Sequence, residues 1–229
     1  MTNDTVQPYY KSAACTEILQ RVAHASRRSV PGLMINFLLN YKLMRKPFEV
    51  AFKTHDFKHA PMAISPDGGE FLYQITRAKK ASLVVEFGTS FGVSAIYLTS
   101  ALRDQGFGRF IGTEIEADKV AEARRNLAAT GLDHVADVRA GDARETLSSI
   151  TESIDILFLD GWKNLYLPIV TLLLPRLPPG SIMLADNMNM FKHDLAPFLE
   201  FVRDPARGRF LSSTLPIGDG LEFAVRLDE

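Results

Sequence analysis

From about residue 64 onward, short apolar runs alternate with segments whose apolar side chains recur at helical spacing. The apolar runs are residues 82–87, 110–114, 154–159 and 181–185, and residues 135–139 predict a further strand that alternates as a sheet margin would. The helical patterns are residues 65–75, 93–103, 117–130, a short stretch ending near residue 150, and 165–177. Strands that alternate with helices predict a parallel sheet with right-handed crossovers and helices on both faces. The pattern therefore indicates a doubly wound, mostly parallel α/β fold.

The C-terminal tail follows a different pattern. A helix is predicted over residues 195–203, and two strand-like runs, 210–215 and 221–227, flank a Gly-Asp-Gly turn at residues 218–220. Two strands joined in this way are typical of an antiparallel pair. We expect this pair at one edge of the sheet.

Two apolar segments near the N-terminus predict two helices, residues 12–27 and 33–39, separated by a break at Pro31-Gly32. Core packing is the expected role of the second helix, with a subunit interface or a substrate lid as alternatives. We expect a single domain over residues 1–229, in which residues 1–61 form a helical extension or lid and 62–229 form the core. His55 and His59 have the spacing of one helical face, but only Asp56 lies near them as a further ligand type, so a pocket-rim segment is preferred to a metal pair.

The composition narrows the choice of partner. Hydrophobic residues make up 46% of the chain, and 26 basic against 27 acidic residues give a net charge of -1. This balance gives no electrostatic case for binding nucleic acid, and no apolar run is long enough to span a bilayer, so a small-molecule substrate is expected. With Cys15 as the one cysteine and no secretory signal pattern at the start, a cytoplasmic location is expected.

Candidate chemistry lies where the predicted strands end. Residues 154–159 are followed by Asp160, Trp162 and Lys163, and residues 181–185 are followed by Asp186 and Asn187. In open α/β sheets the ligand crevice lies just beyond the carboxyl ends of the strands. Two carboxylates and an amide oxygen there suit Mg²⁺, although a polar turn explains Asp186-Asn187 about equally well at this point.

The first strand-to-helix turn indicates the type of ligand. Gly88 and Gly92 frame it, but the spacing differs from G-x-G-x-x-G, which disfavours a dinucleotide. Glu114, after the second predicted strand, is placed to accept hydrogen bonds from a ribose diol, with a helix cap as the alternative. Asp142 can accept from an adenine amino group or cap a helix. An adenosine without a pyrophosphate is the expected ligand.

Four stretches carry a family resemblance: VEFGTSFGVSAIYL (85–98), TEIEADK (113–119), LDGWKNLYLP (159–168) and ADN (185–187). They resemble the S-adenosylmethionine-dependent, metal-dependent O-methyltransferases, most closely the catechol O-methyltransferases, over about residues 62–227. The resemblance implies a class I methyltransferase fold, Rossmann-like, with S-adenosyl-L-methionine as cofactor and Mg²⁺ or another divalent cation. It implies cofactor contacts at Met62, Ile64, Glu86, Gly88, Ser90, Ser94, Glu114, Asp142, Ala143 and Trp162.

The same resemblance implies metal ligands at Asp160, Asp186 and Asn187 and a general base at Lys163. The expected reaction is methyl transfer to one hydroxyl of a vicinal, catechol-like diol. Two departures put simple catechol in doubt, because Ser213 and Ala60 fall where mammalian catechol enzymes carry a glutamate and a tryptophan. The alternatives are a different hydroxyl or carboxyl acceptor with the same cofactor and metal, or a non-catalytic S-adenosylmethionine-binding scaffold. A homodimer is also considered, through the second apolar helix.

Overall fold

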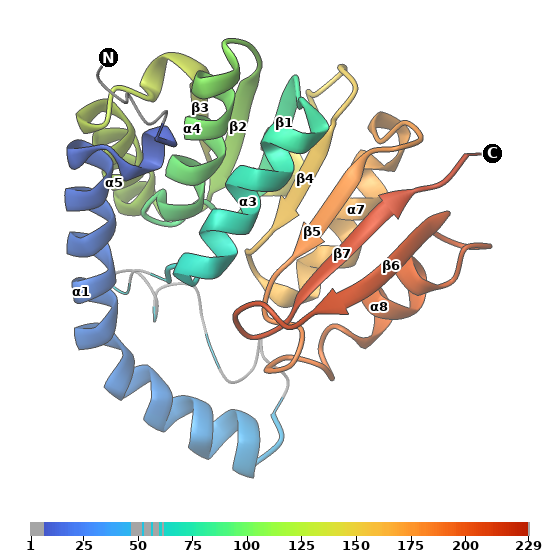
Figure 1. Ribbon diagram of the computed structural model, residues 1–229. Coiled ribbons are helices and arrows are strands. Elements are labelled where there is room, and N and C mark those ends of the chain that lie inside the picture. The colour runs from blue at the N-terminus through green and yellow to red at the C-terminus, as the bar shows by residue number, and fades with distance from the viewer. Residues whose placement is uncertain (1–6, 47–51, 53–55, 57–59, 61, 229) are drawn as a thin grey trace.

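The computed structural model describes residues 7–46, 52, 56, 60 and 62–228. Its centre is a seven-stranded sheet in the order β3-β2-β1-β4-β5-β7-β6 (Figure 1). The strands are β1 (Leu83–Phe87), β2 (Arg109–Glu114), β3 (Ala136–Ala140), β4 (Ile156–Leu159), β5 (Ile182–Ala185), β6 (Phe210–Leu215) and β7 (Leu221–Arg226). Strands β1 to β5 pair in parallel, whereas β7 is antiparallel to both β5 and β6. The predicted parallel sheet with an antiparallel edge pair is confirmed.

Helices cover both faces of this sheet. Their bounds are α3 (Pro66–Lys79), α4 (Val93–Gln105), α5 (Ala117–Ala129), α6 (Ala143–Thr146), α7 (Tyr166–Leu173) and α8 (Ala196–Arg203), with short 3-10 turns at Tyr9–Lys11 (η1), Asp133–Val135 (η4), Lys163–Leu165 (η5) and Leu174–Arg176 (η6). Figure 1 shows α3 in front of the sheet and α7 and α8 behind it. Alternate strand residues supply the two cores, since Ile156 and Phe158 pack with α3 to α5 while Leu157 and Leu159 pack with α6 to α8.

The parallel strands all end at the lower edge of Figure 1. Two backbone segments approach each other closely there. Gly88, which follows β1 and has a φ of +97°, lies against the backbone that follows β4. A Cβ on Gly88 would lie 2.5 Å from the Gly161 Cα, which real Cβ atoms do not tolerate. Glycine at residue 88 therefore lets the ends of β1 and β4 approach each other.

The N-terminal region differs from its prediction. Helix α1 (Ala13–Asn36) runs through Pro31-Gly32 without a break and continues as a π-helical segment, η2 (Phe37–Leu43). The predicted break is wrong, because a proline removes one intrahelical hydrogen bond while the neighbouring backbone groups keep theirs. Figure 1 shows that the helix changes direction along its length and that η2 passes below the ends of the strands.

The predicted core role of this second apolar segment holds only for one side of it. Phe37 and the following Tyr41 pack against the core cluster beside Phe191. Ile35, Leu38 and Leu39 are 60%, 53% and 52% exposed, so core packing is wrong for these three residues. The helical period explains the split, because only one side of a surface helix can face the core.

Three further expectations have simple outcomes. His55 and His59 lie outside the described residues. Helix α7 ends at Leu173, short of the predicted residue 177, and the 3-10 turn Leu174–Arg176, which contains Pro175, follows it. None of the helices in the described ranges combines the length and apolar character needed to cross a membrane.

Candidate active site

A cavity of about 510 Å³ opens at the carboxyl edge of the sheet. Most of the residues predicted for the site line it: Met62, Gly88, Ser90, Glu114, Asp142, Ala143, Asp160, Trp162, Lys163 and Asn187. Four others are buried and do not line it, namely Ile64, Glu86, Ser94 and Asp186. The cavity is within the size range of small-molecule sites.

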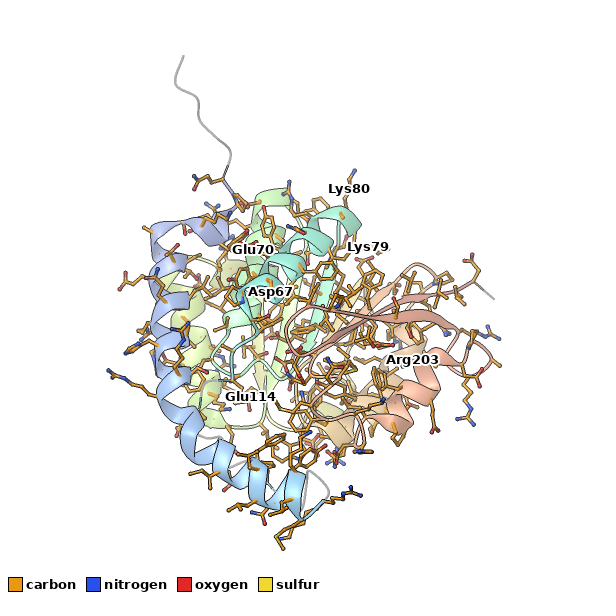
Figure 2. All side chains as sticks on the ribbon, turned by 60° about the horizontal axis from the view of Figure 1, so that its bottom comes forward. Asp67, Glu70, Lys79, Lys80, Glu114 and Arg203 are labelled. Atoms are coloured by element: carbon orange, nitrogen blue, oxygen red, sulfur yellow. The ribbon has the colours of Figure 1, made fainter. Side chains whose placement is uncertain are left out.

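Glu114 joins two turns at the end of β2. Its Oε2 accepts a hydrogen bond from the Ser90 backbone N–H at 2.9 Å, and its Oε1 accepts from the Glu116 N–H at 3.0 Å. Ser90 has a left-handed φ of 49°, which turns its N–H toward the carboxylate. Figure 2 shows Glu114 on the side of the molecule where the parallel strands end. Lys79 and Lys80, at the C-terminal end of α3, lie on the opposite side. The carboxylate is thus held at the cavity wall.

Asp142 and Trp162 lie farther along the same wall. Asp142 caps helix α6, since its Oδ1 accepts from the Arg144 N–H at 2.8 Å, and it also pairs with the Arg144 guanidinium. The helix-cap alternative is therefore present in the structure while the residue still lines the cavity. Trp162 is half-buried beside Leu165 and follows β4 directly after the close approach at Gly161.

Glu86 is a carboxylate with no exposed surface, on the strand that leads to the glycine turn. Neither of its oxygens makes a hydrogen bond of ordinary geometry with the described residues, and the same holds for the hydroxyls of Thr89 and Ser90. Burial raises the pKa of Glu86 to about 7, against a smaller lowering by the nearby Ser94 and Thr89 hydroxyls. Such a cluster of unpaired buried polar groups is typical of a ligand site.

Lys163 is 6% exposed, which is rare for a lysine. Its Nζ donates a hydrogen bond to the Tyr166 Oη at 2.7 Å and lies 3.5 Å from the Asp160 Oδ1. The Tyr166 hydroxyl in turn donates to the Asp186 backbone oxygen at 3.2 Å. Burial lowers the pKa of Lys163, although the carboxylates of Asp160 and Asp186 oppose that change. A lysine whose pKa is lowered gives up its proton more readily than an exposed one and is then free to act as a base.

The two aspartates occupy matching places on neighbouring strands. Leu159 of β4 pairs with Ala185 of β5, so Asp160 and Asp186 follow paired residues. Burial raises the pKa of Asp160 well above its usual value, and Asp186 raises it further, whereas Lys163 lowers it. Burial likewise raises the pKa of Asp186. One ammonium therefore faces two carboxylates, which leaves the cluster negative when both are ionised.

This donor set fits a hard divalent cation. Asp160 and Asp186 supply carboxylate oxygens, and Asn187 at the cavity wall adds an amide oxygen; its backbone N–H donates to the Asp186 Oδ1 at 2.8 Å. Oxygen ligands of this kind suit Mg²⁺. Within the described ranges, no three His, Cys, Asp or Glu side chains gather as a metal group, so the set depends on the amide of Asn187.

Several residues at the site were not predicted from the sequence. Asp219, in the turn between β6 and β7, accepts from the Met190 N–H through Oδ2 at 2.7 Å and so holds the loop after Asn187 in place. The only sequence signal for Asp219 was its position in a Gly-Asp-Gly turn. Tyr166, three residues after Lys163, was visible as a polar residue on the same helical side. Phe37 and Phe52, which also line the cavity, come from the N-terminal region that was expected to form a lid or pocket rim, but neither residue was assigned to the site.

Ser213 and Ala60, the two residues that differ from the mammalian catechol enzymes, lie in different surroundings. Ser213 is exposed on β6, paired with Phe223 of β7, and is not among the residues that line the cavity. Ala60 is buried at 5% exposure. Neither residue supplies a polar or aromatic contact in the cavity, so its acceptor end is formed by other side chains.

Known proteins give an independent comparison. A family model described as a methyltransferase domain matches residues 85–188. The catechol O-methyltransferase of Sus scrofa is 30% identical over 183 residues, which cover 73% of this chain and 95% of that protein. The catechol O-methyltransferase of Niastella koreensis is 30% identical over 131 residues, which cover 56% of this chain. The chain thereby spans only 58% of the length of the Niastella relative.

Solved structures extend the comparison to the fold. The crystal structure of an O-methyltransferase from Streptomyces achromogenes, in complex with SAM, has a TM-score of 0.69 and 22% sequence identity, and the match covers 93% of this chain and 90% of that one. At this identity the match shows a shared fold, the Rossmann-like class I methyltransferase sheet. The sequence relatives show that the chain belongs to the S-adenosylmethionine-dependent O-methyltransferase family that includes the catechol O-methyltransferases.

Proposed function

We propose that this protein transfers the methyl group of S-adenosylmethionine to one hydroxyl of a vicinal, catechol-like diol held on Mg²⁺, with Lys163 as general base. The observation that carries the proposal is the cluster at the ends of β4 and β5. There a buried lysine lies 3.5 Å from the Asp160 carboxylate and joins Asp186 through Tyr166. Family membership and the SAM complex of the Streptomyces structure support the choice of methyl donor.

The donor's parts have matching partners along the cavity. Glu114 at the end of β2 suits the ribose hydroxyls, and Asp142, Ala143 and Trp162 form the wall for the adenine. Glu86, Ser90 and Ser94, around the first turn, suit the amino-acid end, and Gly88 leaves space for it at the end of β1. Met62, at the cavity mouth, and Ile64 complete the cofactor contacts of this proposal.

The reaction needs an acceptor oxygen that has lost its proton. Bound to Asp160, Asp186 and Asn187, Mg²⁺ would act as a Lewis acid that lowers the pKa of a coordinated hydroxyl. Lys163 Nζ takes the hydroxyl proton, and the acceptor oxygen then attacks the methyl carbon as the carbon–sulfur bond breaks. Tyr166 keeps Lys163 beside the acceptor by accepting its hydrogen bond. The chain aligns the reacting atoms and excludes water from them.

The test is methyl transfer to catechols and to matched single-hydroxyl analogues, with Mg²⁺ or with a chelator. The proposal expects transfer to vicinal diols that stops with chelator and returns when Mg²⁺ is added in excess. Activity that does not change with chelator would exclude the metal mechanism. Transfer to single hydroxyls or carboxyls would identify a different acceptor class, and donor binding without turnover would indicate a scaffold.

A further inference from the structure

Lys119 is a second buried lysine in the wall of the cavity. It is 5% exposed and lines the cavity from the first turn of α5. Its Nζ lies 5.8 Å from the centre of the Phe91 ring, a contact of the cation–π type. No residue that the structure describes accepts a hydrogen bond from this Nζ or lies within ion-pair distance of it. Within the described ranges, the ammonium therefore has no carboxylate in direct contact.

The packing of α5 places Lys119 beside the first strand-to-helix turn. A Cβ on Gly92 would lie 3.3 Å from the Ala123 Cβ, so α5 is in direct contact with this turn. Lys119 and Ala123 are four residues apart in α5 and share one side of the helix. Phe91, the residue before Gly92, meets the Lys119 Nζ. Lys119 thus lies at the turn formed by residues 88–92, where the amino-acid end of the donor is proposed to bind.

This position is unfavourable for a cation. Lys119 is the third residue of α5, and the N-terminus of a helix carries a partial positive charge. Burial lowers the pKa of Lys119, although the carboxylates of Glu114, Glu116 and Asp160 oppose that change. Both oxygens of Glu114 already accept hydrogen bonds from backbone N–H groups. A charged lysine here therefore costs stability unless an anion binds beside it.

The other cations among the described lining residues have partners. Lys163 lies 3.5 Å from the Asp160 carboxylate. Arg144 pairs with Asp142. S-adenosylmethionine carries a sulfonium, an ammonium and one carboxylate, and the two cations suit the acids of the cavity wall. The carboxylate needs a positive partner or several hydrogen-bond donors, and Lys119 is the described lining cation that remains for it.

We infer that Lys119 binds the carboxylate of S-adenosylmethionine and thereby selects a donor that carries this group. The inference rests on the proposed function for the identity of the donor. The Ser90 hydroxyl, at the same turn, makes no hydrogen bond with the described residues and can donate one to the carboxylate, while Lys119 supplies the charge. The cofactor contacts implied by the family resemblance do not include Lys119, so it adds a charged contact to that set.

The experiment measures donor binding by calorimetry, without an acceptor and with a chelator, so that no methyl transfer occurs. The ligands are S-adenosylmethionine and its decarboxylated form, which keeps the sulfonium and the amine. The wild-type chain should bind S-adenosylmethionine at least tenfold more tightly. Lys119→Met keeps an unbranched side chain but removes the charge. It should raise the Kd of S-adenosylmethionine about tenfold, a factor that corresponds to about 1.4 kcal/mol, and change that of the decarboxylated form by less than twofold.

Two further variants serve as matched controls. Lys119→Arg keeps a cation at the same place and should keep most of the preference for the carboxylate. Arg125→Met removes a cation from the outer side of the same helix, where the side chain is 66% exposed, and should leave both Kd values unchanged. Equal increases of the two Kd values in Lys119→Met, or no preference for the carboxylate in the wild-type chain, would overturn the inference.

Unfolding measurements distinguish a binding residue from a structural one. Because burial and the helix terminus both disfavour the cation, ligand-free Lys119→Met should be at least as stable toward urea as the wild-type chain. A clear loss of stability in this ligand-free variant would show that Lys119 serves the fold, and would overturn the inference.

The binding experiment does not depend on turnover. A preference for the carboxylate that disappears in Lys119→Met, in a protein that methylates no diol, would support the inference and contradict the proposed reaction. Chelator-sensitive methylation of catechols, together with equal affinity for the two donors, would support the reaction and contradict the role of Lys119.

Discussion

Two buried carboxylates in this sheet have opposite surroundings. Glu222 on β7 is 1% exposed and receives hydrogen bonds from the Arg203 guanidinium at 2.7 and 2.8 Å and from the hydroxyls of Ser212 and Thr214. Burial alone would raise the pKa of Glu222, but these partners lower it below its usual value. Glu86 on β1 is 0% exposed and lacks such partners, and burial raises its pKa to about 7.

The difference separates a structural charge from a functional one. At the antiparallel edge the protein satisfies its buried carboxylate completely, as stability requires. At the ends of the parallel strands Glu86 and Asp186 are buried, Asp160 is 16% exposed, and Lys163 is the cation beside the two aspartates, an arrangement that costs stability. A fold retains such a cost where a ligand supplies the missing partners. This contrast supports the proposed site at the centre of the sheet, beside a structural antiparallel edge.

The largest expected effects come from removing Lys163 at the ends of the parallel strands and Arg203 at the antiparallel edge. Lys163→Ala should lower turnover by about 10²- to 10⁴-fold, because the acceptor then lacks a base, while the affinity for S-adenosylmethionine changes little. Arg203→Ala should leave turnover within twofold but lower the free energy of unfolding by about 1–3 kcal/mol, because Glu222 loses its charged partner. Steady-state kinetics, calorimetric donor binding and urea unfolding measure these outcomes. Turnover of Lys163→Ala near the wild-type value would remove Lys163 as the base.

The next effect is a pair of opposite pH dependences in stability. The Glu86 carboxyl titrates near 4.5 when unfolded and near 7 when folded, so its ionisation penalises the fold above pH 7 and no longer does so below about 4.5. The difference between the two pKa values corresponds to about 3 kcal/mol in the free energy of unfolding. Glu86→Gln should therefore stabilise the ligand-free protein relative to wild type at pH 8, and this gain should be much smaller at pH 5 and vanish below about pH 4.5.

Glu222→Gln should show the reverse dependence. The folded pKa of Glu222 lies below its unfolded value, so its stabilising effect is present above about pH 4.5 and disappears as the pH falls through the folded value. The variant should be destabilised at pH 7, and the difference from wild type should shrink in acid. Urea unfolding of wild type and both variants at several pH values provides the measurement. A Glu86→Gln difference that is the same at pH 5 and pH 8 would contradict the assignment of an unpaired carboxylate.

The smallest expected effect concerns the hydroxyl that links Lys163 to Asp186. Tyr166→Phe removes an acceptor for the lysine and a donor for the Asp186 carbonyl, so unfolding free energy should fall by about 1 kcal/mol and kcat several-fold. Tyr73→Phe is the matched control, because its hydroxyl donates to Asp104 at 2.8 Å outside the cavity. The control should lose comparable stability with unchanged kcat. Equal kcat values for the two variants would show that the Tyr166 link does not serve the reaction.

Much of the fold was predictable because its signals are local. Each of the strands β1 to β5 ends within one residue of its predicted end, since the inner strands appear as short apolar runs and the edge strand β3 as an alternating one. The continuity of α1 through Pro31 was not predictable, because it depends on whether neighbouring turns tolerate one missing hydrogen bond. The exposure of Leu38 and Leu39 depends likewise on which side of η2 meets Phe191.

The sequence by itself determined the succession of strands and helices along the chain, because this follows from the hydrophobic period. It also determined that two acids and a lysine follow the strands, because these residues are adjacent to the strands in the chain. Only the tertiary structure decided that the Glu86 oxygens make no hydrogen bond of ordinary geometry with the described residues while Glu222 has several partners. It also decided that Lys163 joins Asp186 through Tyr166 and that Phe37 meets Phe191 at the cavity. These facts depend on contacts between residues distant in sequence, and neither periodicity nor composition encodes the geometry of such contacts.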